Sequence, residues 1–333
     1  MNYDAVVLVS FGGPEKKDDV IPFLEKVLAG KNVPRGRMLE VAGHYDRFGG
    51  RSPINDQNRA LLSALRRELS ECGMDLPVYW GNRNWHPLLA DTLGAMKADR
   101  VKSALAFVTS AYSSYSGCRQ YLEDIVRARA EAGEGAPRVE KLRAFYNHPR
   151  FIEAIADRIR EARAKIPERR RSSARLVYTA HSIPCAMARV CNYQAQLEET
   201  CRVVSAALAR AGDPLVFQSR SGSPAQPWLE PDILEYLREI AAAEPGVDLI
   251  VAPVGFVSDH MEVVYDLDLE AQSLARKLGI HMIRAGTVGT HPAFVSMIRE
   301  LILERLDSNA ERSALGSLGP RPDACAPECC PPE

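Results

Sequence analysis

The segment with the clearest chemical content runs from residue 253 to residue 270 and reads PVGFVSDHMEVVYDLDLE. Within it, Glu262, Asp266 and Glu270 follow one another at intervals of four residues. Residues at i and i+4 share one face of an α-helix, where like charges repel by a few tenths of a kcal/mol per pair. Such a row is tolerated where water covers the face or where a cation passes along it. We therefore expect a helix with either a solvated acidic face or a route for cations.

Two further considerations favour chemistry at this segment. Steps of four residues drift by about 40° each in an α-helix of 3.6 residues per turn, so a local π-bulge would bring the acids into a straighter line. His181 ends an earlier apolar run and is the candidate partner. An imidazole facing carboxylates suits a divalent first-row metal and proton transfer, although a lone histidine at a strand end is often only structural.

The elements that must position these residues are short apolar runs separated by helical patterns. Continuous runs of this kind are typical of parallel strands that helices cover on both faces. The sequence also repeats itself, because four pairs of segments correspond in the same order: 5–14 with 175–184, 78–83 with 216–220, 101–114 with 247–260, and 147–155 with 290–298. We therefore predict an α/β protein of two similar domains that arose by internal duplication.

The predicted division of the chain is residues 1–160, residues 161–310 and a flexible, cysteine-rich tail over residues 311–333. In open parallel sheets, ligands bind beyond the carboxyl ends of the strands. The loops that begin at Phe11, His181 and Gly255 all start at such ends. Two domains that face each other would thus form a cleft with His181 on one wall and the acidic segment nearby.

The composition limits the classes of partner. The chain has 333 residues, with 42 basic and 43 acidic side chains, so no strong net field favours nucleic acid or an anionic membrane. The N-terminus enters an apolar run directly, without a basic leader or a long apolar segment. We expect a cytoplasmic protein that does not bind nucleic acid and does not insert stably into a membrane.

Several motifs resemble those of the ferrochelatase family, and the resemblance runs from about residue 3 to residue 305. The matching segments are HYDRFGGRSPI at 44–54, TAHSIP at 179–184, QSRSG at 218–222 with WLEP at 228–231, and GFVSDHME at 255–262. The family inserts Fe(II) into a porphyrin during heme biosynthesis. Its fold is two Rossmann-like domains that hold the macrocycle in the cleft between them. The resemblance thus implies a lyase whose substrates are Fe(II) and a porphyrin.

The same resemblance assigns roles to the acidic segment. It implies that His181 and Glu262 are the catalytic pair that binds the metal, and that Asp266 and Glu270 continue as an acidic pathway. Insertion must remove two pyrrole protons and the waters of Fe(II). A neutral imidazole can accept a proton or ligate the metal near pH 7, and carboxylates supply oxygen ligands.

Porphyrin contacts are implied at Tyr45, Ser52, Tyr121 and Phe11. Tyr45 and Ser52 flank a Gly-Gly turn where the family contacts the porphyrin, and Tyr121 could stack on the ring or be part of a helix core. Some bacterial relatives place an iron-contacting tyrosine where this chain has Phe11. Phenylalanine has no oxygen, so it can pack against the ring but cannot ligate the metal.

The expected porphyrin is coproporphyrin III. The segment between Gly30 and Tyr45 is short and charged, and it lacks the long apolar lip of membrane-associated relatives that use protoporphyrin. Four propionates would suit a basic cleft mouth, and the motifs are most like the actinobacterial branch, which uses coproporphyrin. The alternatives are a protoporphyrin IX ferrochelatase, insertion of Co(II) or Ni(II), and a non-catalytic tetrapyrrole or iron carrier. Transient contacts with other enzymes of heme synthesis are also expected.

The tail carries its own pattern, because Cys325, Cys329 and Cys330 fall within six residues. In a cytosolic protein, clustered cysteines indicate metal or redox chemistry rather than disulfides. Thiolates bind [2Fe–2S] clusters in fours, and some ferrochelatases carry such a cluster with three C-terminal ligands and one mid-chain ligand. Cys118 is the best mid-chain candidate, and Cys185 and Cys191 are its competitors. The alternatives are a redox sensor and a disordered tail with reactive thiols.

Overall fold

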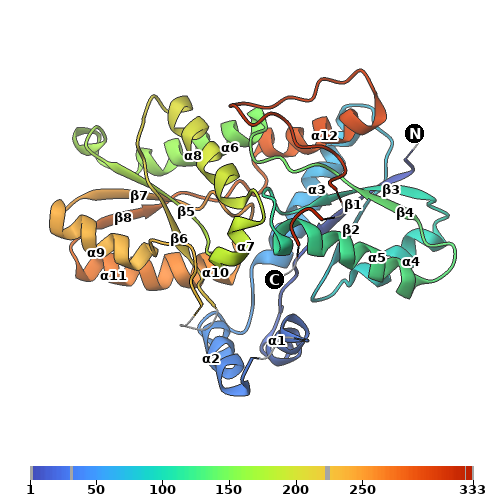
Figure 1. The fold of residues 1–333 in the computed structure, drawn as a ribbon, viewed down its shortest axis with the longest axis horizontal. Coiled ribbons are helices and arrows are strands. Elements are labelled where there is room, and N and C mark those ends of the chain that lie inside the picture. The colour runs from blue at the N-terminus through green and yellow to red at the C-terminus, as the bar shows by residue number, and fades with distance from the viewer. Residues whose placement is uncertain (1–2, 31–32, 222–225, 327, 332–333) are drawn as a thin grey trace.

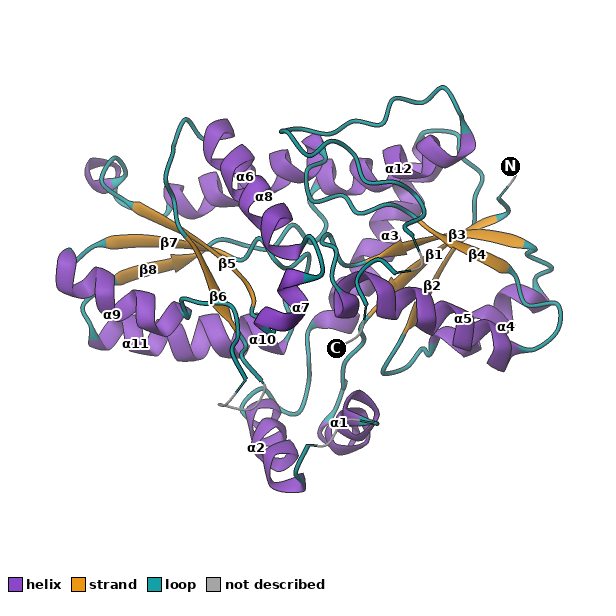
Figure 2. Ribbon diagram, in the orientation of Figure 1, coloured by secondary structure: helices purple, strands orange, loops and turns teal. Residues whose placement is uncertain are grey.

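The computed structural model of this chain describes residues 3–30, 33–221, 226–326 and 328–331. Two sheets lie side by side, each with helices on both faces (Figures 1 and 2). Each sheet has four parallel strands, in the order β2-β1-β3-β4 and β6-β5-β7-β8. The predicted α/β fold of two similar halves is confirmed.

The strands are short, and the inner strands β1, β3 and β7 are buried along their whole length, whereas β5 is buried except at its two ends. Their bounds are β1 (Ala5–Ser10), β2 (Val78–Asn82), β3 (Ser103–Val108), β4 (Arg138–Lys141), β5 (Arg175–His181), β6 (Leu215–Gln218), β7 (Asp248–Ala252) and β8 (His281–Arg284). Every residue of β1, β3 and β7 is buried, because helices cover both faces of the sheet. This burial explains why the runs read as continuously apolar rather than alternating.

The helices follow the repeat as well. The α-helices are α1 (Val20–Leu28), α2 (Arg35–Asp46), α3 (Ile54–Glu71), α4 (Leu89–Ala98), α5 (Gln120–Ala132), α6 (Pro149–Ala164), α7 (Cys185–Arg189), α8 (Tyr193–Ala207), α9 (Ile233–Ala243), α10 (Met261–Val263), α11 (Gln272–Lys277) and α12 (Pro292–Leu306). Two short 3₁₀ segments are η1 (Lys17–Asp19) and η3 (Glu168–Arg170). The third strand of each sheet leads into a π-helix, η2 (Tyr115–Arg119) or η4 (Val264–Ala271).

The two halves exchange a helix. Helix α6 packs against α8, β7 and β8 of the second half, and α12 packs against α3 of the first. Where α6 and α12 meet, each N-terminal histidine faces an acid of the other helix: His148 Nε2 lies 3.5 Å from Glu300, and His291 Nε2 lies 3.5 Å from Asp157. One apolar core therefore runs through both halves. The domain boundary at residue 160, which falls inside α6, stays a prediction.

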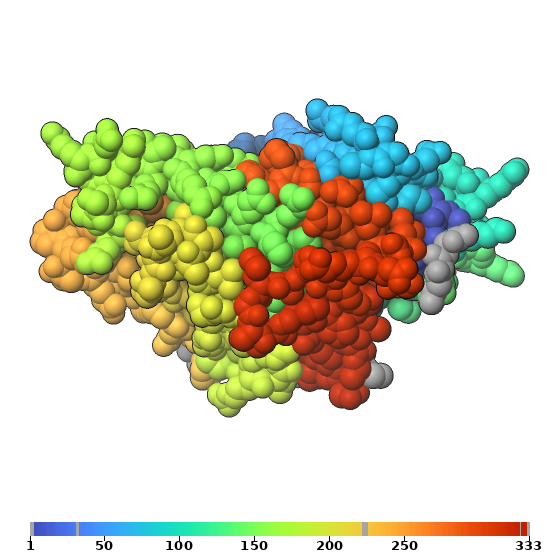
Figure 3. Space-filling model, turned by 90° about the horizontal axis from the view of Figure 1, so that it is seen from above, coloured from blue at the N-terminus to red at the C-terminus, as the bar shows by residue number. Residues whose placement is uncertain are grey.

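The segment after α12 crosses back over both halves. The N–H of Leu315 donates to the carbonyl of Asn147 at 2.8 Å, and the Asn147 amide donates to the Gly319 carbonyl at 2.9 Å. The buried Glu199 of α8 accepts hydrogen bonds from the backbone of Ser317 and Leu318. In Figure 3 this red part of the chain lies against the surface of both halves. Residues 315–319 therefore bond to the body of the protein, and the flexibility of the tail stays a prediction.

Within the described ranges, the longest helices are too short or too polar for any of them to cross a lipid bilayer.

Candidate active site

His181 is the last residue of β5, and both of its ring nitrogens face acceptors. Nδ1 donates to the carbonyl of Ser182, and Nε2 lies 3.3 Å from Oε1 of Glu262. Burial by itself would lower the pKa of His181, but the Glu262 carboxylate, with help from the Ser182 carbonyl and Asp266, raises it to about 9. The imidazole therefore favours its protonated form at neutral pH. It must lose a proton before it can ligate a metal.

The backbone around His181 is fixed by the neighbouring strands and helices. Tyr193 donates its hydroxyl hydrogen to the His181 carbonyl at 2.9 Å, and the N–H of Ser182 donates to the Gln218 carbonyl at 2.8 Å. A Cβ on Gly255 would lie 2.7 Å from the Cα of Ala180, so only glycine lets this turn approach β5 so closely. These contacts constrain the backbone at His181 and so fix the position of the imidazole.

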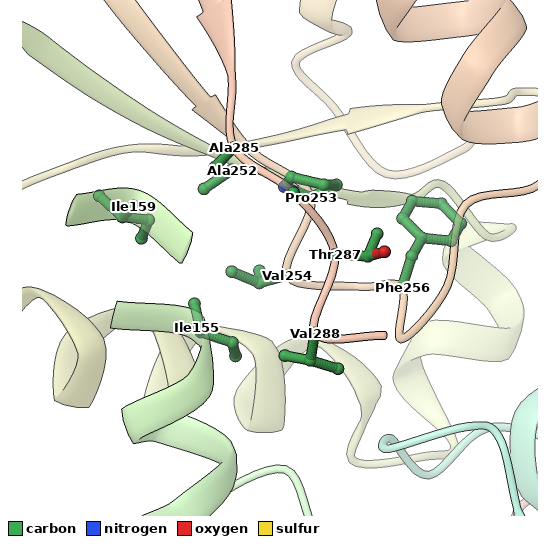
Figure 4. Close-up of a pocket in the computed structure, with 10 residues that line it drawn as sticks. Ile155, Ile159, Ala252, Pro253, Val254, Phe256, Ala285, Thr287 and Val288 are labelled. Atoms are coloured by element: carbon green, nitrogen blue, oxygen red, sulfur yellow. The ribbon is translucent and has the colours of Figure 1, made fainter. Parts of the chain in front are cut away.

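Behind the Pro253–Phe256 turn the protein is apolar. Ile155 and Ile159 of α6 face Val254 across a small hollow (Figure 4). The residues that the structure describes around this hollow are not ionisable, although Arg158 donates to the carbonyl of Thr287 at its edge. The turn therefore separates an apolar interior from the acidic helix.

Glu262 lies where an α-helical turn passes into a π-helix. His260 caps this turn, and its Nδ1 accepts from the N–H of Glu262 at 3.2 Å. From Val264 to Ala271 the chain forms the π-helix η4, so the predicted distortion is confirmed. Gln218, at the end of β6, donates its side-chain amide to the Glu262 carbonyl.

Asp266 lies between the other two acids of the row. Burial raises its pKa to about 7, against a hydrogen bond from the Ser219 hydroxyl, and the charges of Glu262 and Glu270 add to the increase. Glu270 is exposed, and its pKa is also raised by burial of the carboxyl and by nearby Asp232. The row thus runs from the His181 pair towards the surface, and its middle member holds a proton near neutral pH.

Two other acids of the segment belong to a separate network around Arg284. This guanidinium lies 2.8 Å from Asp268 and 3.1 Å from Asp259, and Thr287 donates to Asp259 at 3.1 Å. The N–H of Asp259 also donates to Gln57 of α3 at 2.8 Å, which joins the two halves. Asp268 and Asp259 are therefore neutralised, and they hold η4 in place rather than extending the row.

The opposite wall is aromatic with a buried cation behind it. Arg83 forms an ion pair with Asp124 at 2.8 Å, and their side chains are only 7% and 4% exposed. The guanidinium lies 4.8 Å from the ring centre of Tyr121 and 5.7 Å from that of Phe11, which is 37% exposed. Burial raises the pKa of Tyr121, and the charge of Glu262 contributes. Tyr121 thus lies within the electrostatic reach of Glu262.

Tyr45 and Ser52 occupy different positions near this wall. Tyr45 is buried against Phe23, with ring centres 6.1 Å apart, and burial followed by the charge of Glu262 raises its pKa. Ser52 is 3% exposed, and its N–H donates to the Pro14 carbonyl at 2.9 Å. The structure therefore brings Tyr45 close to the acid pair, whereas Ser52 packs beneath the turn that follows Phe11.

Helices α1 and α2 form a lid on the second half. His44 of α2 stacks on Tyr265 of η4, with ring centres 3.8 Å apart and planes 7° apart. Met38 and Tyr45 of α2 share an apolar cluster with Met261 of α10. These contacts hold α2 against the second half.

The cysteine positions form a second candidate site. The Sγ atoms of Cys329 and Cys330 are 3.6 Å apart, and Cys330 and Cys118 are both buried. Burial raises the pKa of Cys330, and Cys329, Cys118 and Cys191 add to it, so these thiols lie near one another. The donor chemistry fits an iron–sulfur cluster, although no three histidine, cysteine or acidic side chains in the described ranges are arranged as a metal site.

Comparison with solved structures defines the class of fold. The structure of SirB from Bacillus subtilis with Fe³⁺ aligns with a TM-score of 0.57 at 12% identity, over 93% of this chain and all of that one. The structure of CbiX, from denitrifying bacteria, aligns with a TM-score of 0.50 at 15% identity, over 91% of this chain and all of that one. The fold is therefore that of the chelatases.

Sequence comparison then identifies the family. The family model for ferrochelatase matches residues 3–306. A ferrochelatase of Rhodopirellula baltica is 56% identical over 98% of this chain and 93% of its own length. The coproporphyrin III ferrochelatase of Nocardia farcinica is 49% identical over 100% of this chain and 98% of its own length. The chain belongs to the ferrochelatase family.

Several residues of the site were not predicted from the sequence. Gln218 and Ser219 stood in a recognised motif without a role, and they bind the backbone and side chain of the acidic helix. Their place directly after a strand was the available signal. Tyr193 and Arg284 gave no such signal, because they act on groups that are distant in the sequence.

Proposed function

We propose that this protein inserts Fe(II) into coproporphyrin III in heme biosynthesis, with His181 and Glu262 as the pair that binds the metal. The observation that carries the proposal is the 3.3 Å contact between His181 Nε2 and Glu262 Oε1 beside a row of partly protonated acids. An imidazole and a carboxylate are suitable ligands for Fe(II), and both can also transfer protons.

The resting charge of His181 suggests the order of events. Glu262 stabilises the imidazolium, so Fe(II) that binds Glu262 removes that stabilisation and lowers the pKa of His181. The imidazole then releases its proton and becomes able to take a pyrrole proton or to ligate Fe(II). Coupling of this kind would keep the base inactive until the metal arrives.

The acidic row gives the released protons a way out. Asp266, with a pKa of about 7, can accept and release a proton at neutral pH with little cost in either direction. Glu270 is exposed and can pass the proton to solvent. We propose that Asp266 and Glu270 form the acidic pathway in this sense.

For the macrocycle, we propose ring contacts at Phe11, Tyr121 and Tyr45. Phe11 is partly exposed, whereas Tyr121 is buried beside the Arg83–Asp124 ion pair, so Phe11 offers the more accessible ring. Ser52 stays a predicted contact, and its burial supports a role in holding the turn after Phe11. Because Phe11 cannot ligate iron, the metal would be bound from the His181 side alone.

Two observations favour coproporphyrin III: the positive charge on α2, and the substrate for which a similar protein is named. Helix α2 begins at Arg35 and carries Arg37 and, just after its end, Arg47. These cations suit the four propionates of coproporphyrin better than the two of protoporphyrin. The Nocardia farcinica relative is named for the same substrate. Protoporphyrin IX is the alternative.

The test is the absorbance of anaerobic protein incubated with Fe(II) and either porphyrin. We expect the spectrum of the metalated porphyrin to develop faster than without protein, and kcat/KM to be higher with coproporphyrin III. A carrier would bind the porphyrin without accelerating metalation, and that result would defeat the enzymatic proposal. A higher kcat/KM with protoporphyrin IX would reverse the substrate assignment.

We also propose that Cys118, Cys325, Cys329 and Cys330 bind a [2Fe–2S] cluster. The proximity of Cys330 to Cys329 and Cys118 supports this set, and the nearby Cys191 is the competing ligand. When bound, the cluster would supply a covalent tie between the C-terminal segment and the first half. A cytoplasmic location and transient contacts with other enzymes of heme synthesis stay predictions from the sequence.

A further inference from the structure

A second hollow lies outside the candidate active site, between the lid and the second half. It has a volume of about 320 Å³, and residues of α2's C-terminal end, α9, η4 and α11 line it. Figure 1 shows α2 below these helices. Its size is at the lower end of the roughly 300–1,000 Å³ typical of small-molecule sites. The hollow can therefore take a small ligand but not a macrocycle.

The charged lining of this hollow is mostly cationic. Arg47, Arg238 and Lys277 come from three different elements, and Glu270 is the one acid among the lining residues that the structure describes. Glu270 is exposed and repels an anion, so three cations act against one carboxylate at this hollow. Burial raises the pKa of Asp232, and the positive charge of Arg238 lowers it, so Arg238 lies close to this acid as well. The balance favours a ligand with more than one negative charge.

The uncharged lining residues complete the site. Tyr265 forms one side, and Ser273 also lines the hollow while its hydroxyl donates to the carbonyl of Leu269. The other face of Tyr265 stacks on His44 of the lid. Because Arg47 follows α2 directly, the packing of α2 against η4 places this cation at the hollow.

We propose that this hollow binds a small polycarboxylate and that Fe(II) reaches Glu270 as a complex with such an anion. The inference rests on the proposed function, because it concerns how the metal substrate enters the acidic row. Several carboxylates on one small molecule can engage several cations at once, through charge-assisted hydrogen bonds to arginine and lysine. Glu270 belongs both to this hollow and to the row that leads to Glu262.

The transfer is a ligand exchange without redox change. A bond between Fe(II) and a carboxylate oxygen of the anion breaks, and a bond between Fe(II) and a Glu270 oxygen forms. The freed carboxylate keeps its electron pair and its negative charge, and the cations stabilise it until the anion dissociates. Fe(II) then continues to Asp266 and Glu262.

The first experiment measures anion binding without iron or porphyrin. Citrate is titrated calorimetrically into the full-length, metal-free protein and into Arg238→Gln, Lys277→Gln and their double variant. Loss of one charge-assisted contact should weaken citrate binding about tenfold, and the double variant should show no measurable binding. Arg276→Gln is the matched control, because Arg276 is also exposed on α11 but bonds to its own helix at Gln272 and does not line the hollow.

Two outcomes of the titration would overturn the proposal. Equal citrate affinity in the wild type and all variants would mean that citrate binds elsewhere. Inorganic phosphate that binds more tightly than citrate would mean that the hollow selects a different class of anion. Melting temperatures of all variants should match the wild type, which excludes loss of binding through unfolding.

The second experiment follows iron insertion with Fe(II) supplied either as the citrate complex or as the aqua ion. In the double variant, KM for citrate-bound iron should rise about tenfold or more, while kcat and the KM for aqua Fe(II) stay unchanged. An equal loss with both iron sources would show a structural effect and overturn the proposal. If the wild type inserts iron from neither source, the proposed function fails, whereas the citrate titration still decides whether the hollow binds a polycarboxylate.

Discussion

The Nε2 atom of His181 lies 3.3 Å from the Oε1 atom of Glu262, and this contact joins the end of β5 to the start of the acidic helix. It raises the pKa of His181 to about 9 in spite of burial, so the resting site stores one proton on the imidazole. The pair is therefore both the candidate metal site and the first step of the candidate proton route.

Replacement of either member of this pair should remove most turnover. His181→Ala should lose a factor of about 10²–10⁴, in the range of a general acid–base residue, while porphyrin affinity is kept because the imidazole acts on protons and metal. Glu262→Gln should be similarly impaired, since the amide keeps the size but removes the charge that attracts Fe(II). Turnover is measured by metalation kinetics and porphyrin affinity by fluorescence quenching. A near-normal rate in either variant would refute the assignment.

The outer acids should have smaller effects. Asp266→Asn and Glu270→Gln should each lower kcat by about a factor of ten, equivalent to about 1.4 kcal/mol in the barrier. Asp268→Asn is the matched control, because Asp268 bonds to Arg284 and lies outside the row. Its kcat should change less than that of Asp266→Asn when both are measured at the same temperature. Full turnover in the Asp266/Glu270 double variant would refute the pathway, and the row would then be only a solvated acidic face.

The raised pKa of Asp266 predicts a pH-dependent gain in stability for Asp266→Asn. The folded pKa of about 7 lies above the ordinary value of 3.8, so the aspartate costs stability progressively as pH rises from about 4 to about 7. An amide has no such cost. In denaturant unfolding at pH 8, the free energy of unfolding of the variant should therefore exceed that of the wild type by about 1–3 kcal/mol. This difference should shrink towards pH 4.

Asp268→Asn provides the contrast for this stability measurement. Its carboxylate is an acceptor for the Arg284 guanidinium, so its loss leaves a half-buried cation with one partner fewer. That variant should be less stable than the wild type at pH 8. If both variants shift stability in the same direction, the local environment of Asp266 is not the cause.

The cysteine set predicts a visible cofactor. Protein purified without oxygen should be red-brown and should contain two irons and two sulfides per chain, and Cys118→Ser should lose the colour. Loss of the cluster should lower the melting temperature more than it changes turnover, because the tie constrains a long loop in the manner of a disulfide. The hydrogen bonds of Asn147 and Glu199 would still hold the C-terminal segment, which limits the effect.

Cys191→Ser is the informative companion to this experiment, because Cys191 also lies near Cys330. It should keep the full spectrum. If Cys118→Ser keeps the spectrum instead, the fourth ligand must be sought at Cys185 or Cys191. Colourless protein with only free thiols, even after anaerobic reconstitution, would end the cluster proposal.

The sequence alone determined the parts of this protein that depend on local pattern. Continuous apolar runs predicted buried parallel strands, the repeat predicted two similar halves, and the spacing of Glu262, Asp266 and Glu270 predicted the distorted helix that η4 shows. These features depend on side chains that are neighbours along the chain, so they can be predicted from the sequence without a structure.

Only the tertiary structure decided which charges stay free and which groups carry protons. Asp268 looks like its neighbours in the sequence, yet Arg284 neutralises it, whereas burial of the Asp266 carboxyl raises its pKa to about 7. The charge of His181 depends in the same way on the approach of Glu262, which raises its pKa to about 9. Electrostatic energies depend on distance and burial, and folding sets both by bringing together residues that are far apart along the chain.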